Sequence, residues 1–215
     1  FRSLDAEYIV IQGGKMEVGS EEEPFLQKAT ITLHGNEDET IGLPIIGGKV
    51  LGVMGAPGAG NSINGGGAWA SLRDIGELDI HGAPRKQVWS KVQETVVAGT
   101  NFVIVEGEVD FVDGERIILS SPSEELLVAR SSFDGTNSKI MFQTAVAETH
   151  LSEIRVVGGE PMDLRCEVGL LSRNVVIQGD ADTRVSQFGG QTVATSGSEY
   201  RIENVEVRDM GQAGY

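Results

Sequence analysis

The chain has 215 residues, a formal net charge of −15, 29 glycines and only 6% aromatic residues. Because this acidic charge comes without a basic stripe, nucleic acid is excluded as a partner, and binding to anionic lipid is disfavoured. No apolar stretch approaches the length that crosses a bilayer, so no membrane insertion is expected in this segment.

Short apolar or alternating runs bounded by glycine predict β-strands along the whole chain. The runs are at residues 8–12, 15–19, 29–35, 48–54, 77–82, 101–107, 115–121, 139–145, 153–159, 166–172, 174–180 and 200–210. Two-residue Asn-Gly or Asp-Gly turns between matched runs are nearly missing, so hairpins are not expected. The composition and pattern predict an all-β chain.

Similar strands recur along the sequence. "EYIVIQGG" (7–14) resembles "NVVIQGD" (174–180), and "ATITLHGN" (29–36) resembles "ELDIHGA" (77–83). Weak self-similarity at a spacing of tens of residues is typical of solenoids. We therefore predict a right-handed parallel β-helix with short strands and Gly-rich turns.

The two strand-His-Gly segments predict how side chains point. With a two-residue period, the inward residues are Ile31, Leu33, Leu78 and Ile80, and the outward ones are Thr32, His34, Asp79 and His81. We interpret the repeat as two neighbouring coils using the same corner, with Gly35 and Gly82 supplying positive φ where the chain leaves the sheet. His34 and His81 would then lie about 4.8 Å apart.

The segment from Gly52 to Gly76 is rich in Gly, Ala and Asn, which predicts a surface loop, assigned to residues 52–69. A phosphate-binding reading of "GAPGAGNS" fails because the Gly-Lys-Ser/Thr ending and a following helix are missing. Trp69, with Asn61 and Asn64, is the candidate contact to a partner or a sugar. Trp89 is expected to pack against the fold instead.

Candidate chemistry is sparse. Asp180 and Asp182 in "QGDADTR" share a face if extended, so they could bind Ca²⁺ or form a solvated edge. No other cofactor and no catalytic residue is predicted. The single cysteine, Cys166, is interpreted as a small buried hydrophobe in a strand.

Several blocks resemble the G8 domain, which occurs in fibrocystin-like cell-surface proteins and in cell-surface hyaluronidases. The blocks are "AEYIVIQGGKMEVGSEEEPFLQKATITLHGN", "GELDIHGAPRKQVWSKV" and "VDFVDGERIILSS". A later block, "EVGLLSRNVVIQGD", resembles the segment that opens the parallel β-helix repeats of the same proteins. The resemblance implies a G8-like β domain at 1–135, and the first coils of a β-helix at 136–215. A two-histidine segment found downstream in relatives is not within these 215 residues.

The resemblance implies an extracellular or cell-surface location. The expected function is a non-catalytic structural or adhesive module of a large protein, assembling into fibres or coats with further domains of the same chain or with other copies of itself. The alternatives are a glycan-binding module, and a part of a hyaluronidase-type enzyme that needs further coils. Carbohydrate is therefore the other candidate partner, and no cleavage is expected from this fragment alone.

Overall fold

The computed structural model describes residues 2–36, 48–55 and 75–213, which form two compact units. Unit 1 comprises the two ends of the chain, up to Pro84 and from Arg173 onward, and unit 2 is Arg85–Ser172. The regular secondary structure of the described residues is β-strand except for one four-residue helix, α1 (Thr183–Ser186). The sequence-based prediction of an all-β chain is confirmed.

Unit 1 contains three parallel sheets. The first has the order β1-β4-β15-β18, the second β16-β5-β2, and the third β17-β6-β3. Their strands are β1 (Arg2–Ala6), β2 (Tyr8–Gln12), β3 (Gly14–Val18), β4 (Ala29–Leu33), β5 (Val50–Met54), β6 (Gly76–His81), β15 (Val175–Gly179), β16 (Gln191–Ala194), β17 (Glu199–Glu203) and β18 (Val205–Arg208).

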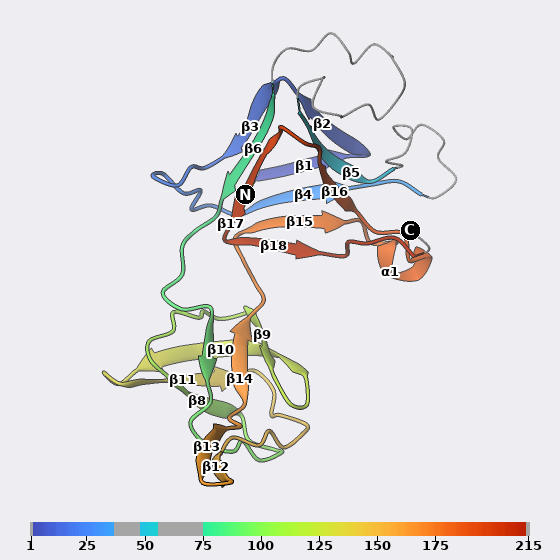
Figure 1. Ribbon diagram of the computed structural model, residues 1–215. Coiled ribbons are helices and arrows are strands. Elements are labelled where there is room, and N and C mark those ends of the chain that lie inside the picture. The colour runs from blue at the N-terminus through green and yellow to red at the C-terminus, as the bar shows by residue number, and fades with distance from the viewer. Residues whose placement is uncertain (1, 37–47, 56–74, 214–215) are drawn as a thin grey trace. The chain divides into compact units, whose positions relative to one another are not determined.

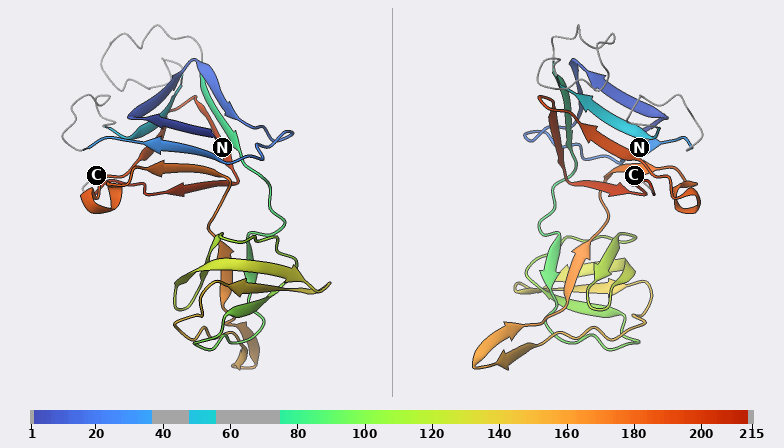
Figure 2. Two further views of the ribbon diagram at one scale, coloured as in Figure 1. Left: turned by 180° about the vertical axis from the view of Figure 1, so that it is seen from behind. Right: turned by 45° about the vertical axis from the view of Figure 1, so that its right-hand side comes forward.

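Successive strands of unit 1 go to successive sheets. Figure 1 shows the sheets as three sides of a triangle, and Figure 2 shows the same arrangement from two other directions. The strands β1, β2 and β3 make one round, β4, β5 and β6 a second, and β15, β16 and β17 a third, before β18 returns to the first sheet.

Alternation within these strands places the core inside the triangle. Ile31, Leu33, Leu78 and Ile80 are all buried, as the two-residue period predicts, and they form one cluster with Leu51, Val53, Val175 and Ile177. Burial of such side chains contributes about 1.5–3 kcal/mol each, which is the main force that stacks one round on the next.

The interpretation of His34 and His81 as equivalent corners of neighbouring coils is wrong. His34 follows β4 in the first sheet, whereas His81 ends β6 in the third sheet, and both strands belong to one round. The two similar sequence segments therefore lie on two different sides of the triangle. The residue that continues the register next to His34 is Asp180, because β15 pairs with β4 with Gly179 opposite Leu33.

Glycine is required at the two predicted turn positions for different reasons. Gly35 has φ +132°, as predicted. Gly82 does not have a positive φ, which corrects the prediction; instead, a Cβ there would lie 2.2 Å from the carbonyl oxygen of Asn204. Close approach of two backbones, not backbone handedness, requires glycine at this position.

Unit 2 is antiparallel, which corrects both the prediction of a continuous parallel solenoid and the expectation that hairpins are missing. Its six-stranded sheet has the order β7-β14-β9-β10-β11-β8 and curls until Val92 and Val105 form a bridge between its two edges. The strands are β7 (Trp89–Lys91), β8 (Phe102–Glu106), β9 (Arg116–Leu119), β10 (Glu124–Phe133), β11 (Asn137–Phe142) and β14 (Glu167–Leu170).

A separate hairpin, β12 (Ile154–Val157) with β13 (Glu160–Asp163), turns at Gly158 and Gly159, both with positive φ. The core of unit 2 is apolar and includes Cys166, which is buried as expected. The predicted domain boundary at residues 135/136 falls between β10 and β11, and it stays a prediction. In the described part of the chain, no helix has the length and apolar character needed to span a membrane.

Candidate functional site

The third sheet of unit 1 carries a charged outer face. Its strands alternate so that apolar residues such as Leu78 and Ile80 point inward and charged residues point outward. The outward set is Lys15 and Glu17 on β3, Glu77, Asp79 and His81 on β6, and Glu199, Arg201 and Glu203 on β17. Opposite charges therefore meet across all three rounds.

Asp79 lies at the centre of this face, with its side chain only 9% exposed. Lys15 Nζ is 3.1 Å from its Oδ2, and Arg201 lies 3.4 Å from the same oxygen. Burial by itself would raise the pKa of Asp79, but the hydrogen bonds from Lys15 and His81 outweigh it, so the pKa is lowered. The carboxylate is held ionised between two cations from the neighbouring rounds.

His81 lies between two carboxylates. Its Nε2 is 2.6 Å from Asp79 Oδ1, and its Nδ1 is 3.2 Å from Glu203 Oε2. A ring engaged on both sides has no free nitrogen to act as a general base. This geometry suits a structural contact within the face rather than proton transfer to a substrate.

A second charged cluster surrounds Asp180. Lys49, which is fully buried, donates to Asp180 Oδ1 at 2.7 Å, to the Phe188 carbonyl at 2.8 Å and to Thr183 Oγ1 at 3.3 Å. Burial alone would raise the pKa of Asp180, but the Lys49 ammonium dominates, so the pKa is lowered. All three donors of the buried ammonium are used.

His34 completes this cluster at the surface. Its Nε2 is 3.2 Å from Asp5 Oδ1, and its Nδ1 is 3.8 Å from Asp180 Oδ2. The three rounds thus meet through β1, the end of β4 and the end of β15. Sequence reasoning found Asp180 and His34 but missed Lys49, because "GGKVLGV" gives no sign that the lysine is buried with φ +54°.

The two residues of the predicted ligand pair have different surroundings. Asp180 pairs with Lys49, and Asp182 precedes α1 as its exposed N-cap residue without a side-chain capping hydrogen bond. Among residues 2–36, 48–55 and 75–213, no group of three or more His, Cys, Asp or Glu side chains is placed to hold a metal ion. Calcium at Asp180 and Asp182 stays a prediction. Trp69, Asn61 and Asn64, and most of the loop 52–69, lie outside the described residues, whereas Gly52 belongs to β5.

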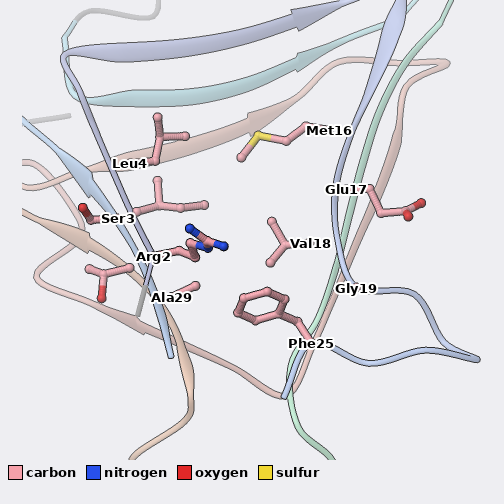
Figure 3. Close-up of a pocket in the computed structure, with 11 residues that line it drawn as sticks. Arg2, Ser3, Leu4, Met16, Glu17, Val18, Gly19, Phe25 and Ala29 are labelled. Atoms are coloured by element: carbon pink, nitrogen blue, oxygen red, sulfur yellow. The ribbon is translucent and has the colours of Figure 1, made fainter. Parts of the chain in front are cut away.

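An apolar hollow of about 260 Å³ opens at the first round of unit 1 (Figure 3). Leu4 comes from β1, Met16 and Val18 from β3, and Phe25 from the following turn; Ala29 and Ile31 of β4 also line the hollow. Arg2 and Glu17 are the charged residues among its lining. The hollow is the inside of the triangle at a round that has no neighbour on one side among the described strands.

Unit 2 holds its own buried polar group. His150 is fully buried, with Nε2 2.9 Å from Glu124 Oε2 and Nδ1 3.1 Å from the Ser120 carbonyl oxygen. Cys166 donates to the same carbonyl at 3.0 Å, and burial raises the pKa of its thiol. A buried thiol with a raised pKa is a poor nucleophile, which supports the structural interpretation of Cys166.

Known proteins resemble this chain at the level of sequence. Residues 2–93 match the G8 domain. The chain is 31% identical over 233 residues to Fibrocystin-L of Mus musculus, covering 99% of this chain and 5% of that protein. It is also 23% identical over 145 residues to a G8 domain-containing protein of Dictyostelium discoideum, covering 64% of this chain and 12% of that protein.

Among solved structures, the tailspike gp61 of Pseudomonas phage phi297 matches with a TM-score of 0.33 and 11% identity, over 97% of this chain and 29% of that one. That likeness is too weak to bear on fold or function. The sequence similarities agree with the resemblance found in the residues themselves. The chain spans only about one twentieth of the length of the fibrocystin-like relative. The function of that whole protein is therefore not assigned to this chain.

Proposed function

We propose that this chain is a non-catalytic structural module of a large extracellular protein with a G8 domain, and that unit 1 forms the first rounds of a right-handed parallel β-helix. The similarity to Fibrocystin-L over 99% of the chain supports the placement in such a protein. The location at the cell surface or outside the cell rests on the same similarity.

One observation carries the structural role: pairing register continues across the insertion of unit 2. In the third sheet, Arg201 of the third round lies opposite Asp79 of the second, although residues 85–172 lie between them in sequence. In the first sheet, Ile177 likewise lies opposite Ile31. A stack that keeps its register around an inserted unit is suited to carrying that unit as a support.

The point of insertion is itself held by hydrogen bonds within unit 1. The Asn174 side chain accepts from the Ala83 N–H at 2.7 Å and donates to the carbonyls of Phe25 and Gln27 at 2.6 and 2.7 Å. One side chain thus joins the chain leaving the stack, the chain returning to it, and the turn after the first round. These hydrogen bonds hold the segments of unit 1 together at the place where the chain leaves for unit 2.

The partners proposed are further domains of the same polypeptide or other copies of it. Strands at the edge of a parallel sheet present unpaired backbone groups, and β1 and β18 are the edge strands of the first sheet among the described residues. A β-helix extends by adding rounds to such edges. A fibre or coat would follow from this kind of addition.

Incubation of the purified chain with high-molecular-weight hyaluronan tests the proposal against the enzymatic alternative. No change in hyaluronan chain length is expected, with or without Ca²⁺, because both His81 nitrogens are engaged and Asp180 is paired with Lys49. Depolymerisation that is lost on Asp180→Asn would replace the structural role by an enzymatic one.

Sedimentation velocity at increasing protein concentration tests the assembly directly. Concentration-dependent end-to-end association is expected if edges recruit other copies. A strictly monomeric chain at every concentration would remove other copies from the proposed partners and leave domains of the same polypeptide.

A further inference from the structure

Trp89 is exposed on the outer face of unit 2. Its side chain belongs to β7, and the residue is 55% exposed, which overturns the expectation that it packs against the fold. Its neighbour Ser90 points inward and is buried, donating to the Glu106 carbonyl at 2.6 Å. Alternation along the strand therefore fixes the indole on the outside of the sheet.

The strand position beside this indole carries no side chain, and we call the space over it the slot. Trp89 pairs with Gly169 on β14, and Gly169 pairs in turn with Ile118 on β9, so the three form one row across the sheet. A Cβ built on Gly169 would meet only Ile118 Cγ2, at 3.5 Å, within 4 Å. The indole does not fill the space over the glycine, and a flat ring could enter it between Trp89 and Ile118.

Paired charges flank the slot on the same outer face. Lys91 Nζ lies 2.7 Å from Glu167 Oε1, in the row next to Trp89 and Gly169. Arg116 lies 3.4 Å from Glu125 Oε2, beside Ile118. Each flank thus offers a hydrogen-bond donor and an acceptor, with little net charge of its own.

We propose that this row, Trp89–Gly169–Ile118 with its two flanking ion pairs, binds a neutral pyranose ring of a glycan. The apolar C–H face of the sugar packs on the indole, and its hydroxyl groups bond to the carboxylate and ammonium or guanidinium groups at the flanks. A neutral sugar fits better than an acidic one because each nearby cation already has a carboxylate partner and the chain carries a net charge of −15.

A protein partner is the less suitable occupant. Stable protein interfaces bury about 800 Å² on each side around a well-packed apolar centre. Here one indole and one partly buried isoleucine are surrounded by charged side chains, which suits a ligand the size of one or two sugar rings. The inference lies within unit 2 and does not depend on the structural role proposed for unit 1.

Isothermal titration calorimetry of the whole chain tests the inference with three probes: cellohexaose and hexa-N-acetylchitohexaose, which are neutral, and a hyaluronan octasaccharide, which is acidic. Saturable binding of at least one neutral probe is expected. Trp89→Ala should weaken it by about tenfold or more, because the indole supplies the stacking surface.

Gly169→Val provides a test that keeps the tryptophan. Its side chain fills the slot, and a β-branched residue suits a strand, so binding should fall while the circular dichroism spectrum is retained. Phe133→Ala is the matched control, because Phe133 is an exposed aromatic of β10 outside the row, and it should bind as the unchanged chain does.

Absence of binding to both neutral probes would overturn the inference. So would binding that is unchanged in Trp89→Ala or in a folded Gly169→Val variant, since either result would place the sugar elsewhere. A preference for the hyaluronan octasaccharide that survives Trp89→Ala would show that the recognised feature is charge rather than the ring face.

Discussion

Lys49 Nζ donates to Asp180 Oδ1 at 2.7 Å, joining residues 131 positions apart. The ammonium is fully buried, and the Phe188 carbonyl and Thr183 hydroxyl take its remaining hydrogens. Because the two partners belong to the second and third rounds of unit 1, this ion pair joins rounds that the inserted unit separates in sequence.

Replacing Lys49 with Met should destabilise unit 1 by about 3–5 kcal/mol, because it leaves the carboxylate of Asp180 without its buried partner. Urea denaturation followed by circular dichroism measures the change. The double variant Lys49→Met with Asp180→Asn should recover part of the loss, since it removes the uncompensated charge. A double variant as unstable as the sum of both single variants would show that the two residues do not act as a pair.

Acidification should weaken unit 1 through Asp180. Its folded-state pKa lies below the ordinary aspartate value of about 3.9, so its contribution is fully present above that value and is lost as pH falls through the folded pKa. The stability difference between the unchanged chain and Asp180→Asn, measured in urea, should therefore shrink below about pH 4. A difference that stays constant down to the acid transition would contradict the lowered pKa.

Asn174 should tolerate neither Ala nor Asp. Alanine removes one acceptor and two donors and is expected to cost about 1–3 kcal/mol. Aspartate should cost more, because its carboxylate keeps the acceptor for Ala83 but faces the carbonyl oxygens of Phe25 and Gln27 without a hydrogen to donate. Thermal unfolding ranks the variants, and an Asp variant more stable than the Ala variant would contradict the assigned amide orientation.

Cys166 should report the unfolding of unit 2 alone. Since the thiol is buried and burial raises its pKa, it should react with Ellman's reagent only after unit 2 opens. Destabilising changes in unit 1, such as Lys49→Met, should leave the rate of labelling unchanged if the units unfold separately. Rapid labelling of the native chain would contradict the burial of this thiol.

Much of the local structure could be predicted from the sequence, but less of the arrangement in space. Alternation correctly placed Ile31, Leu33, Leu78 and Ile80 inside, because strand period and burial are both local properties. The predicted equivalence of His34 and His81 was wrong. In a three-sided stack, a strand pairs with the strand one complete round away, and strands on two sides of the same round can have similar sequences.

Unit 2 escaped prediction for a related reason. Its strands β9 and β11 have the same short apolar pattern as those of unit 1 but pair antiparallel with β10, and strand pattern alone does not fix pairing direction. The ten-residue strand β10 was not predicted, because its sequence EELLVARSSF is not a short apolar run. For the candidate site residues, the sequence indicated one partner of the buried ion pair but not the other. Asp180 was singled out as a ligand and is placed beside Lys49, a residue without a distinctive sequence context.

Close approach of the backbone requires glycine at position 82, whereas position 14 has room for a side chain. Gly82→Ala should destabilise unit 1 by about 1–3 kcal/mol, because the new Cβ would lie 2.2 Å from the Asn204 carbonyl oxygen and the two backbones must move apart. Gly14→Ala is the matched control: it lies in β3, its φ is not positive, and a Cβ there meets nothing within 4 Å. That variant should be neutral or slightly more stable, because alanine has less conformational freedom to lose on folding. Urea denaturation of both variants decides the matter, and equal stabilities would mean that the approach at Gly82 is not as close as the structure has it.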